Sequence, residues 1–257
     1  MVSSVSVDLN ADVGERFDSW QAGDDDAIMR IVTTVHIACG FHSGGPTVMA
    51  ETAAAAVRFG VAIGAHPSYP DREGFGRRPM EINPRQIRDD VLYQIAALDG
   101  IARRAGGRVR SVKAHGALYL RMAVDSDCAG AVALATRDFS DDLWLVVPAG
   151  SLAVGVARSS GLEVAQEAFC DRGYLADGAL SSRGDESAVI TDPDEAARRA
   201  VRLACEGEVD TIEGDTLQLA PATLCVHGDT PGAASLARTV RTALEGAGVT
   251  VGSFVNR

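Results

Sequence analysis

Four side chains that can carry acid–base or ligand chemistry lie near the N-terminus: Asp8, Asn10, Asp12 and Glu15. The first three alternate with apolar residues, so a β-strand here would present them on one face. Inside a closed sheet the carboxylates of Asp8 and Asp12 would be close and poorly solvated, which tends to raise the pKa of at least one of them. They could supply a general base, a metal cage or acceptors for a substrate. The alternative is a solvated edge strand whose acid caps a helix; polar residues at other strand ends favour function.

Histidines follow two of the other predicted strands. His42 comes after the run Ile37 to Phe41, and His66 ends the run that begins at Val61. Together with Asp12 they would form an Asp/His/His set, which suits a divalent metal with open positions. Their spacing is not that of a compact metal motif, and a histidine at a strand end can equally be a hydrogen-bonded packing residue. We assign that packing role to His36, which lies in mid-strand.

Lys113 is the only lysine, since every other basic residue is arginine. In a strand it shares a face with His115, and a buried ammonium group must be paired or lose its proton. The acidic first strand is the natural partner. Such a lysine could neutralise a developing oxyanion or hold a substrate carboxylate, which we favour over a surface position at a strand end.

Arginines and further polar residues follow the remaining strands. Arg77 and Arg78 end a glycine-rich loop, and paired arginines suit carboxylate or phosphate recognition, although the glycines alone would explain an ordered loop. The other candidates at strand ends are Glu167, Asp171, Arg172, His227 and Asp229, of which Asp229 could simply cap the next helix.

Composition excludes several classes of protein. The net charge of −11 argues against a nucleic-acid or anionic membrane partner. The N-terminus lacks a signal-peptide pattern and no apolar stretch is long enough to cross a bilayer, so we expect a cytoplasmic protein. The five cysteines are scattered and form no C-x-x-C pair, as in reduced proteins. Phosphate-loop and G-x-S-x-G motifs are absent, so the residues alone indicate neither ATP use nor covalent catalysis.

Strand-like and helical segments alternate along the chain, which predicts parallel strands with right-handed crossovers in one domain over 1–257. We expect strands near 5–11, 31–38, 61–66, 109–115, 143–148, 162–168 and 222–227. We expect helices near 24–30, 46–59, 84–105, 126–137, 151–159, 193–206 and 231–246. Several strands carry polar residues on one face toward the C-terminal end, which favours a closed barrel over an open sheet buried on both faces. The sequence therefore predicts an α/β fold, a seven-stranded (β/α) barrel.

At these residues the chain resembles the lactam-utilisation proteins, which form the A subunit of bacterial ATP-dependent 5-oxoprolinase. The matching blocks are DLNADVGE at 8–15, IACGFH at 37–42, GAHPSYPD at 64–71, GFGRR at 74–78, VKAHGALY at 112–119, DR at 171–172 and CVHGD at 225–229. They span most of the chain in the family's order. Departures are modest: Ser68 replaces a usual glycine, Ala114 a usual proline, and 34–36 reads TVH where SAN is expected. None removes an ionisable residue from the proposed site.

The resemblance implies a barrel related to polysaccharide-deacetylase and glycoside hydrolase barrels, and cleavage of 5-oxo-L-proline to L-glutamate coupled to hydrolysis of ATP with Mg. It also implies two partner subunits, B and C, one of which could hold or share the nucleotide. Our hypothesis is that Arg77, Arg78 or Arg172 binds the substrate carboxylate and Lys113 stabilises the oxyanion. Asp12 or Glu15, with His66 or His115, then moves protons. We expect Asp8, Asn10, His42, His227 and Asp229 to complete the substrate site.

Two other functions remain open at this point. A metal-dependent deacetylase or amidohydrolase acting alone would use Asp12, His42 and His66 as ligands, and metal analysis would reveal it. A non-catalytic substrate-binding subunit of the complex would bind 5-oxoproline, and the assembled complex would tolerate the loss of Asp12 or Lys113.

Overall fold

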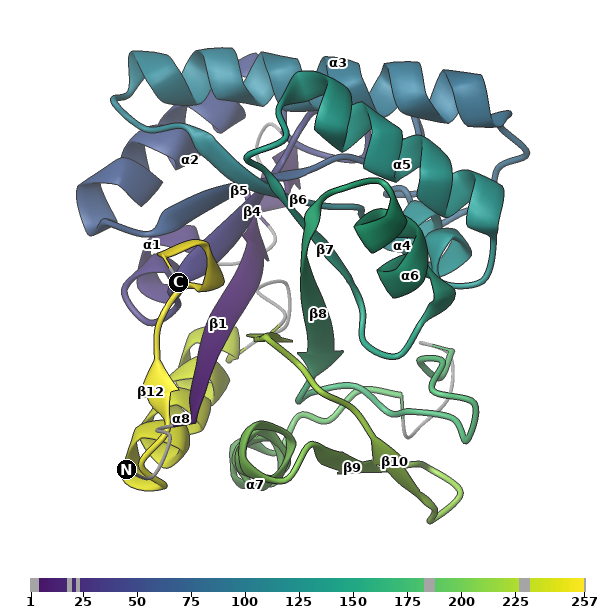
Figure 1. The fold of residues 1–257 in the computed structure, drawn as a ribbon. Coiled ribbons are helices and arrows are strands. Elements are labelled where there is room, and N and C mark those ends of the chain that lie inside the picture. The colour runs from purple at the N-terminus through teal and green to yellow at the C-terminus, as the bar shows by residue number, and fades with distance from the viewer. Residues whose placement is uncertain (1–4, 18–19, 22–23, 183–187, 227–231, 257) are drawn as a thin grey trace.

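The computed structural model describes residues 5–17, 20–21, 24–182, 188–226 and 232–256. Seven parallel strands in this part of the chain form a closed barrel (Figure 1). They are β1 (Ser6–Val13), β4 (Thr34–Ala38), β5 (Ala62–His66), β6 (Val109–Lys113), β7 (Trp144–Pro148), β8 (Glu163–Phe169) and β11 (Thr223–Cys225). Each strand pairs with the next, and β11 pairs with β1 to close the ring. The predicted seven-stranded barrel is confirmed.

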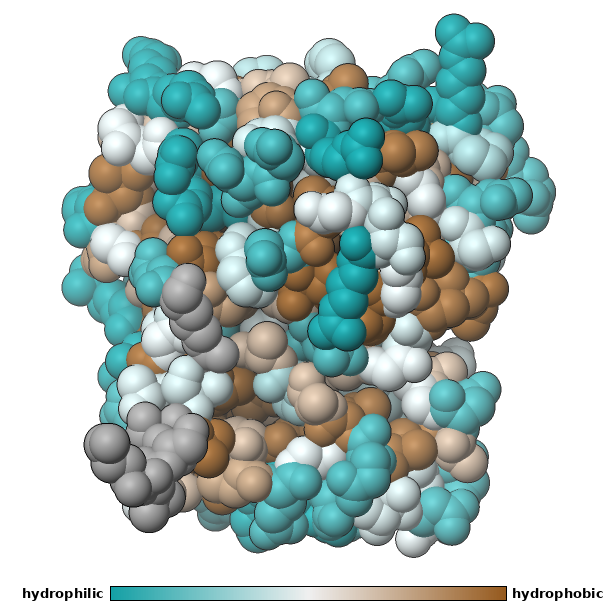
Figure 2. Space-filling view, viewed as in Figure 1, coloured by the Kyte–Doolittle hydropathy of each residue, from teal (hydrophilic) through white to brown (hydrophobic). Residues whose placement is uncertain are grey.

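Helices cover the outside of the barrel. They are α1 (Asp25–Met29), α2 (Pro46–Phe59), α3 (Pro84–Arg104), α4 (Gly116–Met122), α5 (Ser126–Phe139), α6 (Leu152–Ser159), α7 (Pro193–Cys205) and α8 (Ala233–Gly246). Figure 1 shows α3 and α5 side by side, and α7 packs against α8. On the face shown in Figure 2, hydrophilic residues are spread over the upper helices and hydrophobic residues form smaller patches among them. None of the described helices combines the length and apolar character needed to cross a membrane.

Helix α3 shows why these segments fold as they do. Asn83 accepts a hydrogen bond from the backbone N–H of Gln86, and Pro84 occupies the first turn, where a missing N–H has no cost. Ile87 and Leu98 lie on the apolar stripe that packs against the barrel and are buried. Burying that stripe stabilises the helix and fixes the strands that it connects.

The barrel interior changes from apolar at one end to charged at the other. Phe254, in the short 3₁₀ helix Phe254–Asn256, is fully buried in a cluster with Val146 and Ala165. Arg110 donates to the carbonyl of Val255 and fastens this segment to β6. The C-terminal ends of the strands form the opposite, polar mouth, which is where barrels of this type place their sites.

The structure also contains elements that the sequence pattern did not predict. These are α4, the short hairpins β2 (Arg16–Phe17) with β3 (Trp20–Gln21) and β9 (Glu208–Asp210) with β10 (Thr216–Gln218), and β12 (Thr250–Val251), which pairs with the start of β1. Strand β4 begins at Thr34 rather than 31, because Ile31 and Val32 form a hydrogen-bonded turn after α1. Strand β11 ends at Cys225, short of the expected 227.

Candidate active site

The single lysine lies at the centre of the barrel mouth. Lys113 ends β6, and its Nζ is 3.0 Å from Asp12 Oδ1 on β1 and 2.9 Å from Glu167 Oε1 on β8. Its side chain is only 3% exposed, so carboxylates rather than water neutralise the ammonium group. The three residues are far apart in the sequence, but the carboxyl ends of parallel strands meet at one mouth. The lysine therefore faces the acidic first strand, as expected.

Asp12 and Lys113 keep their charges in this buried place. Burial alone would raise the pKa of Asp12, but the charges of His66 and Lys113 hold it well below its usual value. Burial alone would lower the pKa of Lys113, but Asp12 and Glu167 raise it well above its usual value. The pKa of Glu15 is also lowered, since the neighbouring side chains of His115 and His42 outweigh its burial. The expectation that crowding of Asp8 and Asp12 raises at least one carboxyl pKa does not hold for Asp12, because cationic groups lie beside it.

Glu167, a candidate at a strand end to which the sequence assigned no specific role, and Tyr119, which was not a candidate, complete the lysine network. Glu167 accepts hydrogen bonds from Asn10 Nδ2 at 3.0 Å and from the hydroxyl of Tyr119 at 2.7 Å. Asn10 Oδ1 in turn accepts from Lys113 Nζ at 3.3 Å. The signal for Glu167 was its inward phase with Ala165 along the strand, whereas Tyr119 lies on α4, a helix too short to show a clear period.

Asp8 lies below the mouth and does not reach the substrate side. Its carboxylate is fully buried and accepts hydrogen bonds from the hydroxyls of Thr33, Thr34 and Thr223. Because these donors occupy it within the barrel, Asp8 ties strands together. The prediction that Asp8 binds substrate is therefore corrected, and Asn10, which is also fully buried, acts on the site through Glu167 and Lys113.

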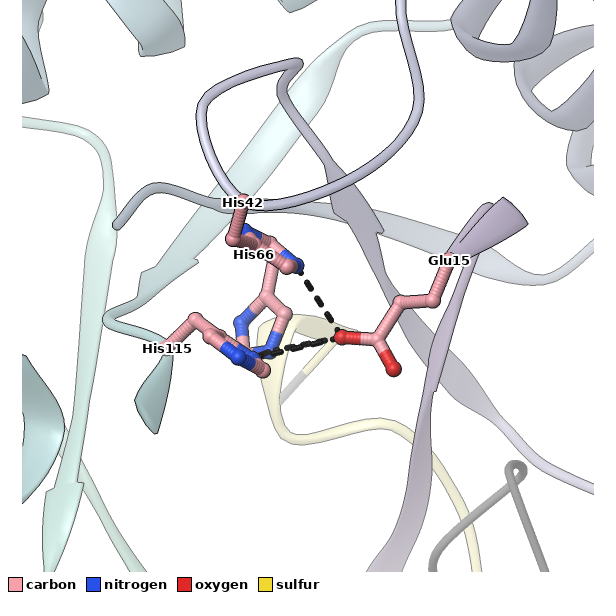
Figure 3. A group of neighbouring side chains, drawn as sticks. All are labelled: Glu15, His42, His66 and His115. Atoms are coloured by element: carbon pink, nitrogen blue, oxygen red, sulfur yellow. Dashed lines mark hydrogen bonds and ion pairs between the residues drawn. The ribbon is translucent and has the colours of Figure 1, made fainter. Parts of the chain in front are cut away.

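A second group of side chains at the barrel mouth consists of Glu15, His42, His66 and His115 (Figure 3). Glu15 Oε1 is 3.0 Å from His42 Nε2, 3.2 Å from His115 Nδ1 and 3.8 Å from His66 Nε2. His66 Nε2 and His115 Nδ1 are 3.0 Å apart, and His66 Nε2 is also 3.3 Å from Asp12 Oδ2. Glu15 and the three histidines are buried, and one atom from each lies within 4.8 Å of the others. The carboxylate that joins His42 and His66 in this metal-capable group is Glu15 rather than Asp12.

The histidines of this group differ in protonation. Burial opposes charge on His66, but Asp12 raises its pKa above the usual value. Burial and the neighbouring His115 lower the pKa of His42 to about 3, and burial likewise lowers the pKa of His115. His42 and His115 stack in parallel with ring centres 3.7 Å apart. His36, one layer deeper, bonds Asn10 Oδ1 at 3.2 Å and keeps the packing role assigned to it.

The glycine-rich loop after β5 supports the histidines. Phe75 has a positive φ of 54°, and its carbonyl accepts a hydrogen bond from His115 Nε2 at 2.8 Å. Asp71 accepts hydrogen bonds from Gly74 N and from the guanidinium group of Arg78, and thereby closes the loop. The prediction that Arg78 binds substrate is corrected, because this arginine is bound to Asp71 and shapes the loop that positions Phe75.

A cavity of about 390 Å³ opens at the mouth beside Lys113. Arg77 and Arg172 line it, together with apolar side chains that include Phe169 and Leu180. The guanidinium of Arg172 is buried and donates to the carbonyls of Ser181 and Ala188, which fixes its position. Lys113, Asp12, His66 and His115 also line this cavity, and His227 and Asp229 lie outside the described residues.

Comparisons with known proteins agree over nearly the whole chain. Residues 7–257 match the model of the LamB/YcsF family. The chain is 50% identical over 249 residues to a protein of Methylococcus capsulatus named as the A subunit of 5-oxoprolinase, covering 97% of this chain and 96% of that protein. It is 49% identical over 245 residues to the protein of the same name from Heliobacterium modesticaldum, covering 95% and 96%.

Solved structures support the same fold. The crystal structure of a lactam utilization protein from Thermus thermophilus superposes with a TM-score of 0.91 at 45% identity, covering 97% of this chain and all of that one. A peptidoglycan deacetylase from Bacillus subtilis has a TM-score of 0.50 at 12% identity, covering 99% of this chain and 90% of that one, which supports the barrel architecture alone.

Proposed function

Because this chain belongs to the LamB/YcsF family, we propose that it is the A subunit of an ATP-dependent 5-oxoprolinase. The complex would convert 5-oxo-L-proline and water to L-glutamate while ATP is hydrolysed. The observation that carries the proposal is the buried Lys113–Asp12 pair facing a small cavity in a chain so similar to named 5-oxoprolinase subunits. A buried cation beside an ionised carboxylate suits attack on an amide carbonyl, where negative charge develops on oxygen and a water must lose a proton.

The cavity suits a small, negatively charged ring. Arg77 and Arg172 on its wall would bind the substrate carboxylate, since guanidinium groups pair with carboxylates through two parallel hydrogen bonds. The apolar side chains of Phe169 and Leu180 would contact the ring methylenes. This placement leaves the lactam carbonyl near Lys113.

In the proposed reaction, Lys113 stabilises the charge on the lactam oxygen and Asp12 accepts the proton of the attacking water. Water adds to the carbonyl carbon, the bond from carbon to the ring nitrogen breaks, and that nitrogen takes up a proton. We assign no proton step to His66 or His115, because each of their ring nitrogens already has a protein partner. ATP with Mg would supply the driving force by transferring its γ-phosphoryl group to the lactam oxygen. After the ring opens, a second water would displace that oxygen as phosphate, so that both oxygens of the new carboxylate come from water.

The nucleotide site and the partners are part of the same proposal. The chain has no phosphate-loop motif, so we place the ATP site on the partner subunits B and C or at their contact with this chain. The requirement for ATP places the reaction in the cytoplasm.

The test is release of glutamate from 5-oxoproline with ATP and Mg, by this chain alone and with candidate subunits B and C. Turnover only in the complete mixture would support the proposal. Turnover by the chain alone without ATP would instead indicate a stand-alone hydrolase and would refute it.

Variants of two residues on strand β6 test the role of Lys113 in this assay. Lys113→Met should abolish coupled turnover, whereas Arg110→Met, the matched loss of a cation at the other end of β6, should keep most of it. Full activity of Lys113→Met would exclude the proposed role of this lysine. Binding of 5-oxoproline with unchanged turnover in both Lys113→Met and Asp12→Asn would indicate a non-catalytic binding protein.

A further inference from the structure

We propose that Glu15, His66 and His115 bind one divalent transition-metal ion at the barrel mouth. The inference concerns metal binding and does not depend on the chain acting on a lactam. It rests on where the ring nitrogens of the two histidines point and on what lies between them.

Backbone carbonyls fix the orientation of both histidines. His66 Nδ1 donates to the carbonyl of Lys113 at 2.8 Å, and His115 Nε2 donates to the carbonyl of Phe75 at 2.8 Å. When the rings are neutral, as metal binding requires, the other nitrogen of each ring carries a lone pair. Metal-binding histidines characteristically make this kind of outer hydrogen bond through the nitrogen that does not bind the metal.

The two lone pairs and a carboxylate converge on one point (Figure 3). His66 Nε2 and His115 Nδ1 are 3.0 Å apart, and Glu15 Oε1 is 3.8 Å and 3.2 Å from them. Three possible ligand atoms this close can share one cation between them. Ligand atoms about 2.0–2.1 Å from a tetrahedral ion are about 3.4 Å from one another, so the observed separations match a metal site.

The backbone around the group supports a built site. Phe75 adopts a positive φ of 54°, an unfavourable conformation for a residue with a side chain, and its carbonyl is thereby aimed at His115. A Cβ on Gly76 would lie 2.8 Å from atoms of both His115 and His42, so the loop packs tightly against the rings.

His42 acts as a positioning residue rather than a ligand. Its ring lies parallel to that of His115 at 3.7 Å, so the in-plane lone pairs of the two rings cannot meet at one ion. Its Nε2 instead lies 3.0 Å from Glu15 Oε1 and can donate to it, and within the described residues its buried Nδ1 has no hydrogen-bond partner. His42 would thus orient the ligating carboxylate.

The ligand chemistry and the charges select the kind of ion. Two imidazoles and one carboxylate suit Zn²⁺, Co²⁺, Fe²⁺ or Mn²⁺, whereas Mg²⁺ prefers oxygen ligands alone. The carboxylates of Asp12 and Glu167 share the ammonium group of Lys113, and Glu15 adds a third carboxylate beside His66 and His115, so a dication would offset this negative charge. Because His66 and His115 also line the cavity, the open position of the ion would face a bound substrate.

The experiment measures metal binding directly, on the full chain with Cys205→Ser to remove the exposed thiol. Metal-free protein is titrated with Zn²⁺ by calorimetry and with Co²⁺ by visible absorption, and metal content is measured after desalting. We expect one equivalent per chain and no competition from millimolar Mg²⁺. Absence of stoichiometric binding by this otherwise native chain would overturn the proposal.

Single variants then identify the ligands, with thermal unfolding used to verify that each is folded. Glu15→Gln, His66→Gln and His115→Gln should each weaken binding by more than the ~10–100-fold expected for loss of an outer partner, and His42→Gln by an amount within that range. His36→Gln is the matched control, a buried histidine outside the group, and should bind as the parent does.

The Co²⁺ spectrum distinguishes a metal ligand from a residue that only positions a ligand. His42→Gln should keep the band positions of the parent, because the atoms bound to the ion are unchanged, while His115→Gln should lose them. Equal losses in His36→Gln and His115→Gln would overturn the site, and an altered spectrum in His42→Gln would overturn the positioning role of His42.

Discussion

Replacement of Lys113 by methionine should destabilise the barrel much more than the loss of an exposed ion pair. Methionine fills a similar volume but removes the ammonium group that lies 3.0 Å from Asp12 and 2.9 Å from Glu167. Both carboxylates would then be buried without their cation. Removal of one partner from a buried ion pair costs about 3–5 kcal/mol, and we expect the free energy of unfolding to fall by that amount near pH 8.

The loss of unfolding free energy in Lys113→Met should become smaller as the pH falls. In the native protein the pKa of Asp12 is lowered, so its pairing stabilises the fold above about pH 4 and is lost as the pH falls through the folded-state value. In Lys113→Met, burial without the cation favours neutral carboxyl groups. The folded variant then binds more protons than the unfolded chain at mildly acidic pH, so its stability rises from pH 8 to pH 5 relative to the native protein.

Urea unfolding followed by circular dichroism at pH 8 and pH 5 measures both effects. The matched control is Arg58→Met, which removes a cation paired with Asp26 when both side chains are more than half exposed, and it should cost at most about 1 kcal/mol. The double variant Lys113→Met/Glu167→Gln should recover part of the loss, because the glutamine keeps its shape without a charge.

Two results would refute this reasoning. A Lys113→Met variant no less stable than Arg58→Met would mean that the carboxylates do not need the ammonium group. A deficit equal at pH 5 and pH 8, with no recovery in the double variant, would mean that the loss arises from packing rather than charge.

Further changes test the barrel interior and the loop. Gly64→Ala would place a Cβ against the ring of His36 and 2.5 Å from Ser111 Oγ, so the free energy of unfolding should fall by about 1–3 kcal/mol. The control is Gly130→Ala on α5, where the Cβ would enter open space, and it should be neutral or stabilising by up to about 1 kcal/mol. Thermal unfolding of both variants measures the difference. If the proposed function holds, Arg78→Ala should lower kcat through the loop, and Arg77→Ala should raise KM for 5-oxoproline. Steady-state kinetics that showed the reverse would exchange these roles.

The alternation of polar and apolar residues predicted the barrel because a closed sheet separates its two faces. Asp12 and Lys113 could be expected to meet, since each is an inward residue at the carboxyl end of a strand. The same rule wrongly predicted that Asp8 binds substrate. Asp8 shares the face of Asp12 but lies deeper in the barrel, where its carboxylate accepts hydrogen bonds from threonine hydroxyls. Phase along a strand predicts which face a side chain takes, and depth decides whether it reaches substrate.

Other parts of the site depend on contacts that no local pattern encodes. The carbonyl of Phe75 orients His115, and a backbone group carries no sign in the residue types around it. Arg78 pairs with Asp71 inside its own loop. The sequence of two adjacent arginines does not indicate which of them binds within the loop and which faces the cavity. Glu15 joins the histidines because the chain turns after β1 at Gly14, whose φ is 71°.

The preference for lysine at position 113 follows from the shape of its surroundings. Four groups face its Nζ: Asp12, Glu167, Asn10 Oδ1 at 3.3 Å and Cys225 Sγ at 3.2 Å. They approach one atom from several strands, which suits the compact ammonium group with its three rotatable donors. A planar guanidinium directs its donors into one plane, which does not match partners that approach from several strands. A chain that otherwise uses arginine for every basic position therefore keeps one lysine where a point charge must be enclosed.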